Sequence, residues 1–353
     1  MSNTPIAGLL VLPFLGSAAL VLGFGSPVIR ALARARARQP ISGDAPASHQ
    51  VKHGTPTMGG LLLLGAVAVA TLGAVVAHAV EGGQARLLGV AATFLFAGGI
   101  GLLDDLGKAR KKQNKAGLSE RVKLALQILV AAGFLFVIGR TEQAGVTTVL
   151  TLGGRTFDLG VWYYALGVLY LCAFGNAANF TDGLDGLLSG TTLIVAIALG
   201  ATVGVFAPEV RVFYGAVAGA CAGFLWFNAH PARVFMGDTG SLALGMGLAA
   251  AAIAAKQELL LLVVGLVYVL EIGSMLLQRY VFKFRRIRRG LEYAQSHRVF
   301  RRAPLHHHFE ELGWPETQVV IRFWVVGLLA AALGILLAPQ LSPGVLRFGG
   351  PNP

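Results

Sequence analysis

The sequence predicts an all-α polytopic membrane protein, one that crosses a membrane many times. Of its 353 residues, 55% are hydrophobic and only 13% are charged, and the mean hydropathy is +0.67. A soluble globular domain carries about 25% charged residues, so this chain has too few charges to cover a soluble surface. We therefore expect one integral membrane domain over residues 1–353, with a flexible tail rich in Gly and Pro over residues 341–353.

Ten apolar stretches account for this composition. A membrane-spanning helix needs roughly 20 predominantly apolar residues. The stretches cover about residues 5–29, 58–80, 87–104, 122–139, 161–178, 186–206, 211–228, 239–255, 258–281 and 318–338. The first is too long for the core of a signal peptide, so we expect it to remain in the protein. The 47 glycines suit helices that pack closely in lipid.

The basic residues orient these ten spans. All but six of the 29 Lys and Arg residues follow odd-numbered stretches or begin the tenth. The six on the opposite side are Arg86, Arg140, Arg155, Arg211, Lys256 and Arg347. By the positive-inside rule, the basic loops are cytoplasmic and both termini are extracytoplasmic. Topology and attraction to anionic lipid heads explain the net charge of +12, with a phosphorylated substrate as the alternative; nucleic acid is not an expected partner.

One extracytoplasmic loop, residues 141–160, is longer than the others. Its apolar and polar residues alternate on both sides of Gly153-Gly154. This alternation around a turn signal predicts a small β-hairpin on the extracytoplasmic side.

Acidic residues collect on the predicted cytoplasmic side. In the stretch Asn179–Leu187, NFTDGLDGL, the side chains of Asn179, Asp182 and Asp185 are spaced three residues apart. A helix would place all three on one face. Acids beside membrane-length apolar runs are costly unless they lie at the water boundary or have a function. We therefore expect this stretch to belong to a functional site.

Two further acidic positions lie on the same side. Asp104 and Asp105 close the third apolar stretch and are followed by Lys108, and Asp238 stands between the seventh and eighth stretches. Neighbouring residues cannot share one helix face, so we expect Asp104 and Asp105 to have different partners. Asp238 is interpreted as a helix N-cap, as a ligand of a hard cation, or as both.

The segment Leu305–Glu310, LHHHFE, places three histidines on the cytoplasmic side. His306, His307 and His308 cannot all face one metal ion from a regular helix, and zinc sites use wider spacings. Contact with phosphate or proton transfer is the better interpretation. Glu271 lies inside the ninth stretch, where a hydrogen bond between helices is favoured over catalysis.

The available ligands indicate a hard metal ion. The two cysteines, Cys172 and Cys221, lie inside apolar runs, so a thiolate site is not expected. Carboxylates suit Mg²⁺ or Mn²⁺. Acids, Mg²⁺, basic residues and histidines at the level of the lipid headgroups together favour phosphoryl transfer to a lipid phosphate.

Five long motifs occur along the chain in order. They are GTPTMGG at Gly54–Gly60, DDLGK at Asp104–Lys108, NFTDGLDGL at Asn179–Leu187, FLWFNAHPARVFMGDTGSL at Phe224–Leu242 and APLHHHFEELGWPE at Ala303–Glu316. With them the chain resembles the phospho-N-acetylmuramoyl-pentapeptide transferases, a branch of the polyprenyl-phosphate N-acetylhexosamine-1-phosphate transferase superfamily. The first four motifs describe the superfamily, and the histidine block followed by GWPE marks the branch.

The resemblance implies a function and an architecture. It implies ten spans, a homodimer, and a Mg²⁺-dependent cleft that faces the cytoplasm from the bacterial inner membrane. The reaction would join UDP-MurNAc-pentapeptide and undecaprenyl phosphate to give lipid I and UMP, the first membrane step of peptidoglycan synthesis. The resemblance leaves a one-step attack and an aspartyl-phosphate intermediate as alternatives.

The resemblance also assigns residues by their positions in the motifs. Asp104 and Asp105 match the catalytic acid pair, Asp238 matches the Mg²⁺ ligand, and His306, His307 and His308 match the histidine block. The expected substrate-binding residues are Lys52, Lys108, Asn179, Asp182, Gly183, Leu184, Asp185, Asn228 and Phe235. Among them, Gly183 and Leu184 would line a uracil pocket, and Phe235 would stack on the base.

One segment departs from the resemblance, and two alternative functions stay open. Residues 284–299 are longer and more basic than expected before the histidine block. A sister enzyme would transfer GlcNAc-1-phosphate from UDP-GlcNAc, and the GWPE-linked histidine block argues against it. A lipid or solute transporter would place charged residues near the midplane, and Glu271 alone supports that alternative.

Overall fold

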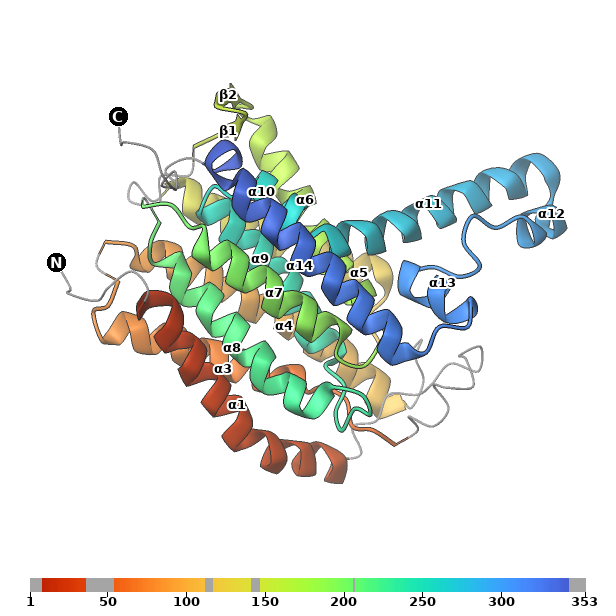
Figure 1. Ribbon diagram of the computed structural model, residues 1–353, viewed down its shortest axis with the longest axis horizontal. Helices are drawn as coiled ribbons and strands as arrows, with labels where there is room; N and C mark the ends of the chain where they lie inside the picture. Colours follow the sequence, from red (N-terminus) through yellow and green to blue (C-terminus); the bar gives the residue numbers. More distant parts are fainter. Residues whose placement is uncertain are drawn as a thin grey trace.

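The computed structural model describes residues 8–35, 54–80, 82–111, 117–140, 147–205 and 207–342. These residues form a bundle of helices with one two-stranded sheet (Figure 1). The helices are α1 (Gly8–Arg34), α3 (Gly60–Val76), α4 (Gln84–Lys111), α5 (Glu120–Arg140), α6 (Trp162–Thr181), α7 (Leu187–Ala201), α8 (Val210–Asn228), α9 (Gly237–Ala254), α10 (Glu258–Val264), α11 (Leu266–Arg289), α12 (Leu291–Ser296), α13 (Leu305–Glu311) and α14 (Glu316–Leu341); the strands are β1 (Val149–Leu152) and β2 (Arg155–Asp158). Lys52 and residues 343–353 of the expected tail lie outside the described part of the chain.

Helix α9 forms the centre of the bundle. Every residue of α9 except Asp238 is buried, and the helix contacts α3, α4, α6, α7, α8 and α10. A helix that is apolar on all sides belongs in a core. The first turn of α9 is therefore held by several helices at once.

Small residues bring α1 against α8. Gly215 and Gly219 of α8 face the carbonyl oxygens of Leu10 and Phe14, and a Cβ at either glycine would overlap those oxygens; Gly223 repeats the spacing. Glycines four residues apart let two membrane helices approach closely. This contact explains part of the high glycine content.

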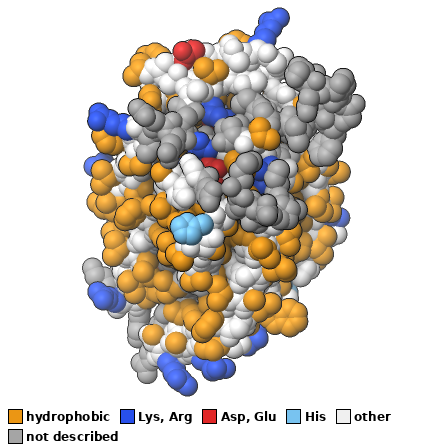
Figure 2. Space-filling model, turned by 90° about the vertical axis from the view of Figure 1, so that its left-hand side faces the viewer, with side chains coloured by type: hydrophobic (Ala, Val, Ile, Leu, Met, Phe, Trp, Pro, Cys, Tyr) orange, Lys and Arg blue, Asp and Glu red, His pale blue; other side chains and the backbone are white. Residues whose placement is uncertain are grey.

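The exterior is that of a multi-pass membrane protein. Six helices, α1, α4, α5, α8, α9 and α14, are long and apolar enough to cross a membrane, and the bent pair of α10 and α11 would make seven. Helices α3 and α7 are apolar but shorter, and α6 falls below the same threshold. Figure 2 shows one face on which hydrophobic side chains cover the middle, while Lys and Arg lie mainly towards its ends. Each of the ten predicted stretches contains a helix.

The ninth stretch is broken, which the sequence did not predict. Helices α10 and α11 meet at Gly265 with a bend of 81°. Gly265 donates its backbone N–H to Leu261 O at 2.8 Å, and a side chain there would crowd that carbonyl. A glycine at a helix break is a common cause of a sharp kink. The stretch predicted over 258–281 is therefore made of two helices at an angle and not of one continuous helix.

Two other expectations concern the ends of elements. The predicted β-hairpin is confirmed: β1 and β2 are antiparallel, with Leu152 opposite Arg155. Gly153 and Gly154 have φ values of 59° and 78°, as a two-residue turn with a left-handed backbone requires. The acid pair Asp104-Asp105, however, does not close the third helix, because α4 continues to Lys111.

Candidate active site

The first turn of α9 is capped by a carboxylate from another helix. Asp105 of α4 accepts hydrogen bonds from the N–H of Asp238 at 3.2 Å, the N–H of Thr239 at 3.0 Å and the hydroxyl of Thr239 at 2.7 Å. The first N–H groups of a helix lack partners within it and carry partial positive charge. The cap is thus Asp105, and the interpretation of Asp238 as the N-cap is wrong.

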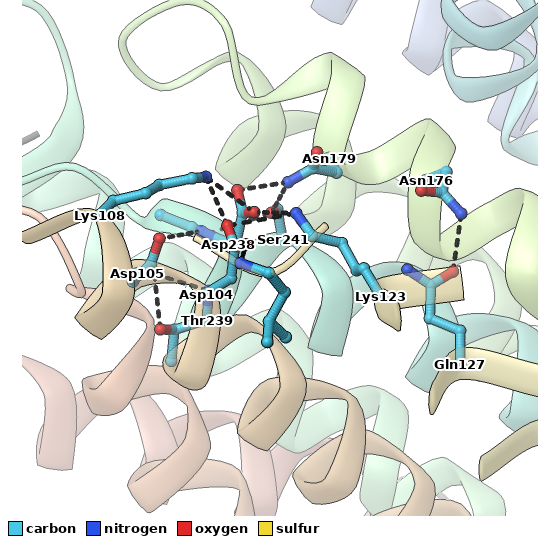
Figure 3. A network of polar contacts seen from close by, with 12 residues as sticks. Asp104, Asp105, Lys108, Lys123, Gln127, Asn176, Asn179, Asp238, Thr239 and Ser241 are labelled. Carbon is cyan, nitrogen blue, oxygen red and sulfur yellow. Dashed lines mark hydrogen bonds and ion pairs between the residues drawn. The ribbon is translucent and has the colours of Figure 1, made fainter. Parts of the chain in front are cut away.

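The side chain of Asp238 is free of capping and faces three polar groups (Figure 3). Lys108 Nζ lies 3.1 Å and Lys123 Nζ 2.5 Å from its Oδ2, and Asn179 Nδ2 donates to its Oδ1 at 2.8 Å. Asn179 also donates to Ser241 Oγ at 2.9 Å. Helices α4, α5, α6 and α9 each supply a side chain to this point.

Asp104 faces the same two lysines. Its Oδ2 lies 2.6 Å from Lys108 Nζ and 3.3 Å from Lys123 Nζ, and its Oδ1 accepts the N–H of Leu118 at 2.7 Å. Asp104 and Asp105 therefore have different partners, as expected from their adjacent positions. One carboxylate fixes the lysines, and the other fixes the start of α9.

Glycines allow the surrounding helices to approach the first turn of α9. A Cβ at Gly101 of α4 would overlap the carbonyl of Asp238, and one at Gly60 of α3 would overlap the backbone of Gly240. Gly237 has φ +74° and packs against Asp105, so a side chain there would be strained as well as crowded. The glycines keep Asp238 at a fixed place between α3 and α4.

Lys123 is the main site residue that the sequence did not single out. Its side chain is 18% exposed and contacts both Asp104 and Asp238. It lies in the first turn of α5, where the apolar part of that helix begins. A lysine at such a boundary, in the helix that follows the acid pair Asp104-Asp105, is the signal that could have identified it.

Asp182 lies next to this cluster. It accepts a backbone hydrogen bond from Gly237, the residue before Asp238. Loss of water contact, followed by the nearby negative charges of Asp238, Asp105 and Asp185, raises the pKa of Asp182 well above its usual range. Asp182 and Asp185 therefore have different surroundings. Asp182 lies beside the first turn of α9, whereas the side chain of Asp185 contacts the loop that contains Ala232.

Asp185 belongs to a second cluster. Its Oδ2 accepts the N–H of Ala232 at 3.1 Å and lies 3.2 Å from His230 Nδ1, and its own N–H donates to Glu316 Oε1 at 2.8 Å. Ligand atoms of Asp185, His230 and Glu316 lie within 4.8 Å of one another. His230 and Glu316 were not among the expected site residues, although Glu316 ends the GWPE motif.

Asn228 is a buried residue that connects two segments by hydrogen bonds. Its Oδ1 accepts from the N–H of Gly186 at 3.2 Å and the hydroxyl of Ser189 at 3.0 Å, and its Nδ2 donates to Val234 O at 3.0 Å. These bonds tie the start of α7 to the loop before α9. The side chain is 4% exposed, so in this structure it stabilises the relative position of these two segments.

The remaining expected nucleotide residues lie along the same loop and turn. Phe235 is partly exposed, and its backbone pairs with the GTPTMGG segment through Pro56 and Gly59. Leu184 is buried in an apolar cluster with Leu187 and Val267. Leu184 therefore packs the turn against α11, and Phe235 keeps a ring at the surface.

The three histidines point in three directions. His306 is 1% exposed, and its Nδ1 lies 2.8 Å from Glu271 Oε2, while its backbone N–H donates to Glu271 Oε1 at 3.2 Å. His307 Nδ1 lies 2.6 Å from Glu310 Oε2. His308 Nδ1 accepts the N–H of Arg301 at 3.2 Å. A single metal site for the block is thereby excluded for these side-chain positions.

Glu271 connects α11 to α13, which agrees with the expectation of a hydrogen bond between elements. The second ring nitrogen of His306, Nε2, is buried and has no hydrogen-bond partner among the described residues. It points at Gly183, where a Cβ would overlap it. Glu271 thus orients an imidazole towards the turn that carries Asp182.

An apolar groove runs along the outside of α6. Its volume is about 340 Å³. It is lined by Leu166, Leu169, Tyr170, Ala173, Phe174 and Ala177 of α6, by Leu262 of α10 and by Val269 and Ile272 of α11. The last of the α6 residues, Ala177, precedes Asn179 by two positions. The groove therefore reaches the last turns of α6, the helix that also carries Asn179.

Comparisons with known proteins identify the family of this chain. Residues 87–256 match glycosyl transferase family 4, and residues 52–64 match signature 1 of the phospho-N-acetylmuramoyl-pentapeptide-transferases. A relative with that name from Gemmatimonas aurantiaca is 45% identical over 347 residues, which cover 90% of this chain and 90% of the relative. This chain belongs to the phospho-N-acetylmuramoyl-pentapeptide-transferase family.

Two other relatives with the same name extend the comparison. The protein from Shouchella clausii is 42% identical over 92% of this chain and 97% of its own. The protein from Geobacillus thermodenitrificans is 45% identical over 87% of this chain and 90% of its own. The similarity to this family thus covers the bundle, the acid clusters and the histidine block together.

The donor set around Asp238 fits a hard divalent cation. Oxygens of Asp104, Asp105 and Asp238 lie within 4.8 Å of one another, and Mg²⁺ prefers oxygen ligands. Both oxygens of Asp105 are engaged with the first turn of α9. Asp238 and Asp104 therefore remain as possible ligands of the ion. An ion between them would compete with the ammonium groups of Lys108 and Lys123 for the carboxylate oxygens.

Proposed function

We propose that this protein transfers phospho-MurNAc-pentapeptide from UDP-MurNAc-pentapeptide to undecaprenyl phosphate, which yields lipid I and UMP. The observation that carries the proposal is the meeting of Asp238 with Lys108 and Lys123 at the first turn of α9. A site of this kind offers carboxylates for a cation and ammonium groups for phosphates within one cluster. Family membership supports the same reaction.

The charges favour a ternary arrangement of protein, cation and pyrophosphate. Three carboxylates and two ammonium groups leave the cluster negative on its own, which would repel an anion. Mg²⁺ held by Asp238 and Asp104 would reverse that balance and neutralise charge on the phosphates. Lys108 and Lys123 would then be released to donate to phosphate oxygens, as lysines commonly do.

The acceptor would lie in the apolar groove along α6. The isoprenoid chain fits a lining formed almost wholly by hydrocarbon, and the groove reaches the last turns of α6, the helix that carries Asn179. A phosphate monoester has a second pKa of about 6, so it is largely ionised at neutral pH. Its oxygen would attack the sugar-linked phosphorus, the bond to the second phosphate would break, and UMP would leave.

The engagement of Asp105 supports the one-step alternative. Its oxygens accept three hydrogen bonds from α9, which lowers the nucleophilicity of the carboxylate. The task of the site is then mainly to position two phosphates. Asp182, Gly183, Phe235 and Lys52 would bind the nucleotide, and His306 would approach it through Nε2.

We also propose ten crossings, extracytoplasmic termini, a cytoplasmic site in the bacterial inner membrane, and a homodimer. The excess of basic residues in the loops beside the site supports the orientation. The broken ninth stretch and the short α3 and α7 would each count as one crossing. Labelling of single introduced cysteines with a membrane-impermeant reagent in cells tests the orientation, and native mass spectrometry tests the dimer.

The decisive assay is release of UMP by the purified protein. We expect release from UDP-MurNAc-pentapeptide only when undecaprenyl phosphate and Mg²⁺ are both present, and loss of release when the ion is removed with a chelator. Faster turnover with UDP-GlcNAc would indicate the sister enzyme. Substrate movement without UMP release would indicate a transporter, although Glu271, its one supporting residue, is engaged with His306.

A further inference from the structure

The outer half of α11 leaves the bundle. Figure 1 shows α11 extending away from the other helices, with α12 at its far end. The bend of 81° after α10 gives α11 this direction. Residues 276–289 of α11 therefore present one helix face that the described helices of the bundle do not cover.

That face carries an apolar stripe. Tyr280 is 66% exposed, Phe284 58% and Ile287 74%. The stripe consists of Leu276, Leu277, Tyr280, Phe284 and Ile287, each of them exposed. At about 100° per residue these positions fall within an arc of roughly 100° on the helix. Five large apolar side chains on one narrow arc call for a nonpolar environment.

Basic side chains border the stripe. On the same helical geometry, Lys283 and Arg286 lie along one edge and Arg288 lies along the other. Residues 279–302 contain nine Lys and Arg side chains and one acid, Glu292. An apolar stripe with basic borders is the pattern of a helix that lies in the headgroup region of a membrane.

The charges select among three possible occupants of the stripe. A second copy of the chain would bring the same basic borders into contact, and like charges would repel. A soluble partner would have to reach a helix that starts inside a membrane bundle. The membrane itself is continuous with that bundle, and its anionic headgroups complement the basic borders.

We propose that the outer half of α11 lies in the headgroup layer and binds anionic phospholipid. The inner half of the same helix carries Glu271, which holds His306. Gln278 also exchanges two hydrogen bonds with the backbone of Phe300, at 3.0 and 3.3 Å. The lipid contact is thus made by the helix that holds the segment leading to the histidine block.

The test measures how deeply α11 lies in the bilayer. The full-length protein, with Cys172 and Cys221 replaced by alanine, carries one spin label at Ile287→Cys on the stripe or at Arg289→Cys on the opposite face. It is placed in nanodiscs of phosphatidylcholine alone or mixed with phosphatidylglycerol. Accessibility to oxygen reports lipid, and accessibility to a nickel chelate reports water.

We expect the ratio of oxygen to nickel accessibility to be severalfold higher at position 287 than at 289 when phosphatidylglycerol is present. The ratio at 287 should fall in phosphatidylcholine alone. Lys283→Gln with Arg286→Gln should abolish the response to phosphatidylglycerol. Arg30→Gln with Arg34→Gln, a matched pair of exposed bases on α1, should leave the response intact.

Three results would overturn the proposal. Ready access of the nickel chelate to position 287 in the anionic nanodiscs would show that the stripe faces water. Protection of that position from both reagents would show that protein covers it. An equal ratio in the two lipid compositions would show that the basic borders do not select anionic lipid.

Discussion

The two ends of α9 both bury charged side chains, but they balance them differently. After the last turn, Lys256 Nζ donates to Thr147 O at 3.0 Å, Tyr163 Oη at 3.1 Å and Glu258 Oε1 at 2.8 Å. Tyr163 also donates to Glu258. An ammonium group has three protons, and here each has an acceptor. This end is a closed network that fastens α9 to α6 and to the segment before the hairpin.

The first turn of α9, about 27 Å away by helix rise, is not balanced in this way. Asp104, Asp105 and Asp238 outnumber the two ammonium groups of Lys108 and Lys123. The lysines are shared between carboxylates, so each can exchange a carboxylate for another anion. A balanced network stabilises the fold, whereas an unbalanced one leaves charge for a ligand to complete.

The largest expected effect is on turnover when the first turn loses a carboxylate. Asp238→Asn keeps the shape and removes the charge that would hold a cation, so UMP release should fall by about 10³-fold, the range seen when a key electrostatic group is removed. Glu258→Gln, which removes one carboxylate from the other end of α9, should retain turnover. Near-normal turnover of folded Asp238→Asn would contradict the assignment of the metal site.

A smaller loss is expected when one of the two lysines is removed. Lys123→Gln should lower kcat/KM by about 10²-fold, because one donor to the phosphates is lost while Lys108 remains. Arg121→Gln is the matched control, since Arg121 lies two residues away on α5 and is exposed. Steady-state kinetics of both variants would show whether Lys123 acts on the substrate; equal kinetics would remove it from the site.

At the other end of α9 the expected effect is on stability. Lys256→Met leaves Glu258 without its charged partner, and breaking a buried ion pair from one side costs about 3 kcal/mol. The melting temperature in detergent should fall by several degrees, while UMP release per folded molecule stays the same. If turnover fell as far as in Lys123→Gln, the two ends would not differ in the way described above.

The smallest expected effect is the pH dependence contributed by His307. Burial lowers its pKa below the ordinary value, although the hydrogen bond with Glu310 opposes this. The unfolded chain therefore binds a proton more readily than the folded one, so stability is lost as pH falls through about 6.5 towards the folded-state value. Thermal unfolding between pH 5.5 and 7.5 should show a shallower loss in His307→Asn than in the unchanged protein.

The sequence predicted the class of fold and the types of residue in the site. Hydropathy and charge identified a helical membrane protein, because both depend on composition along the chain. Gly153-Gly154 predicted the hairpin through its local backbone preference. Asp104, Asp105 and Asp238 were recognisable because acids beside apolar runs are costly without a purpose.

The tertiary structure decided which of those residues meet and what each one does. Asp105 caps α9, Asn228 connects α7 to the loop before α9, and Lys123 of α5 reaches Asp238. These contacts join residues 42, 115 and 133 positions apart in the chain, and sequence spacing does not encode them. The bend at Gly265 is of the same kind, because an apolar run predicts burial in lipid equally well for a straight helix and for a broken one.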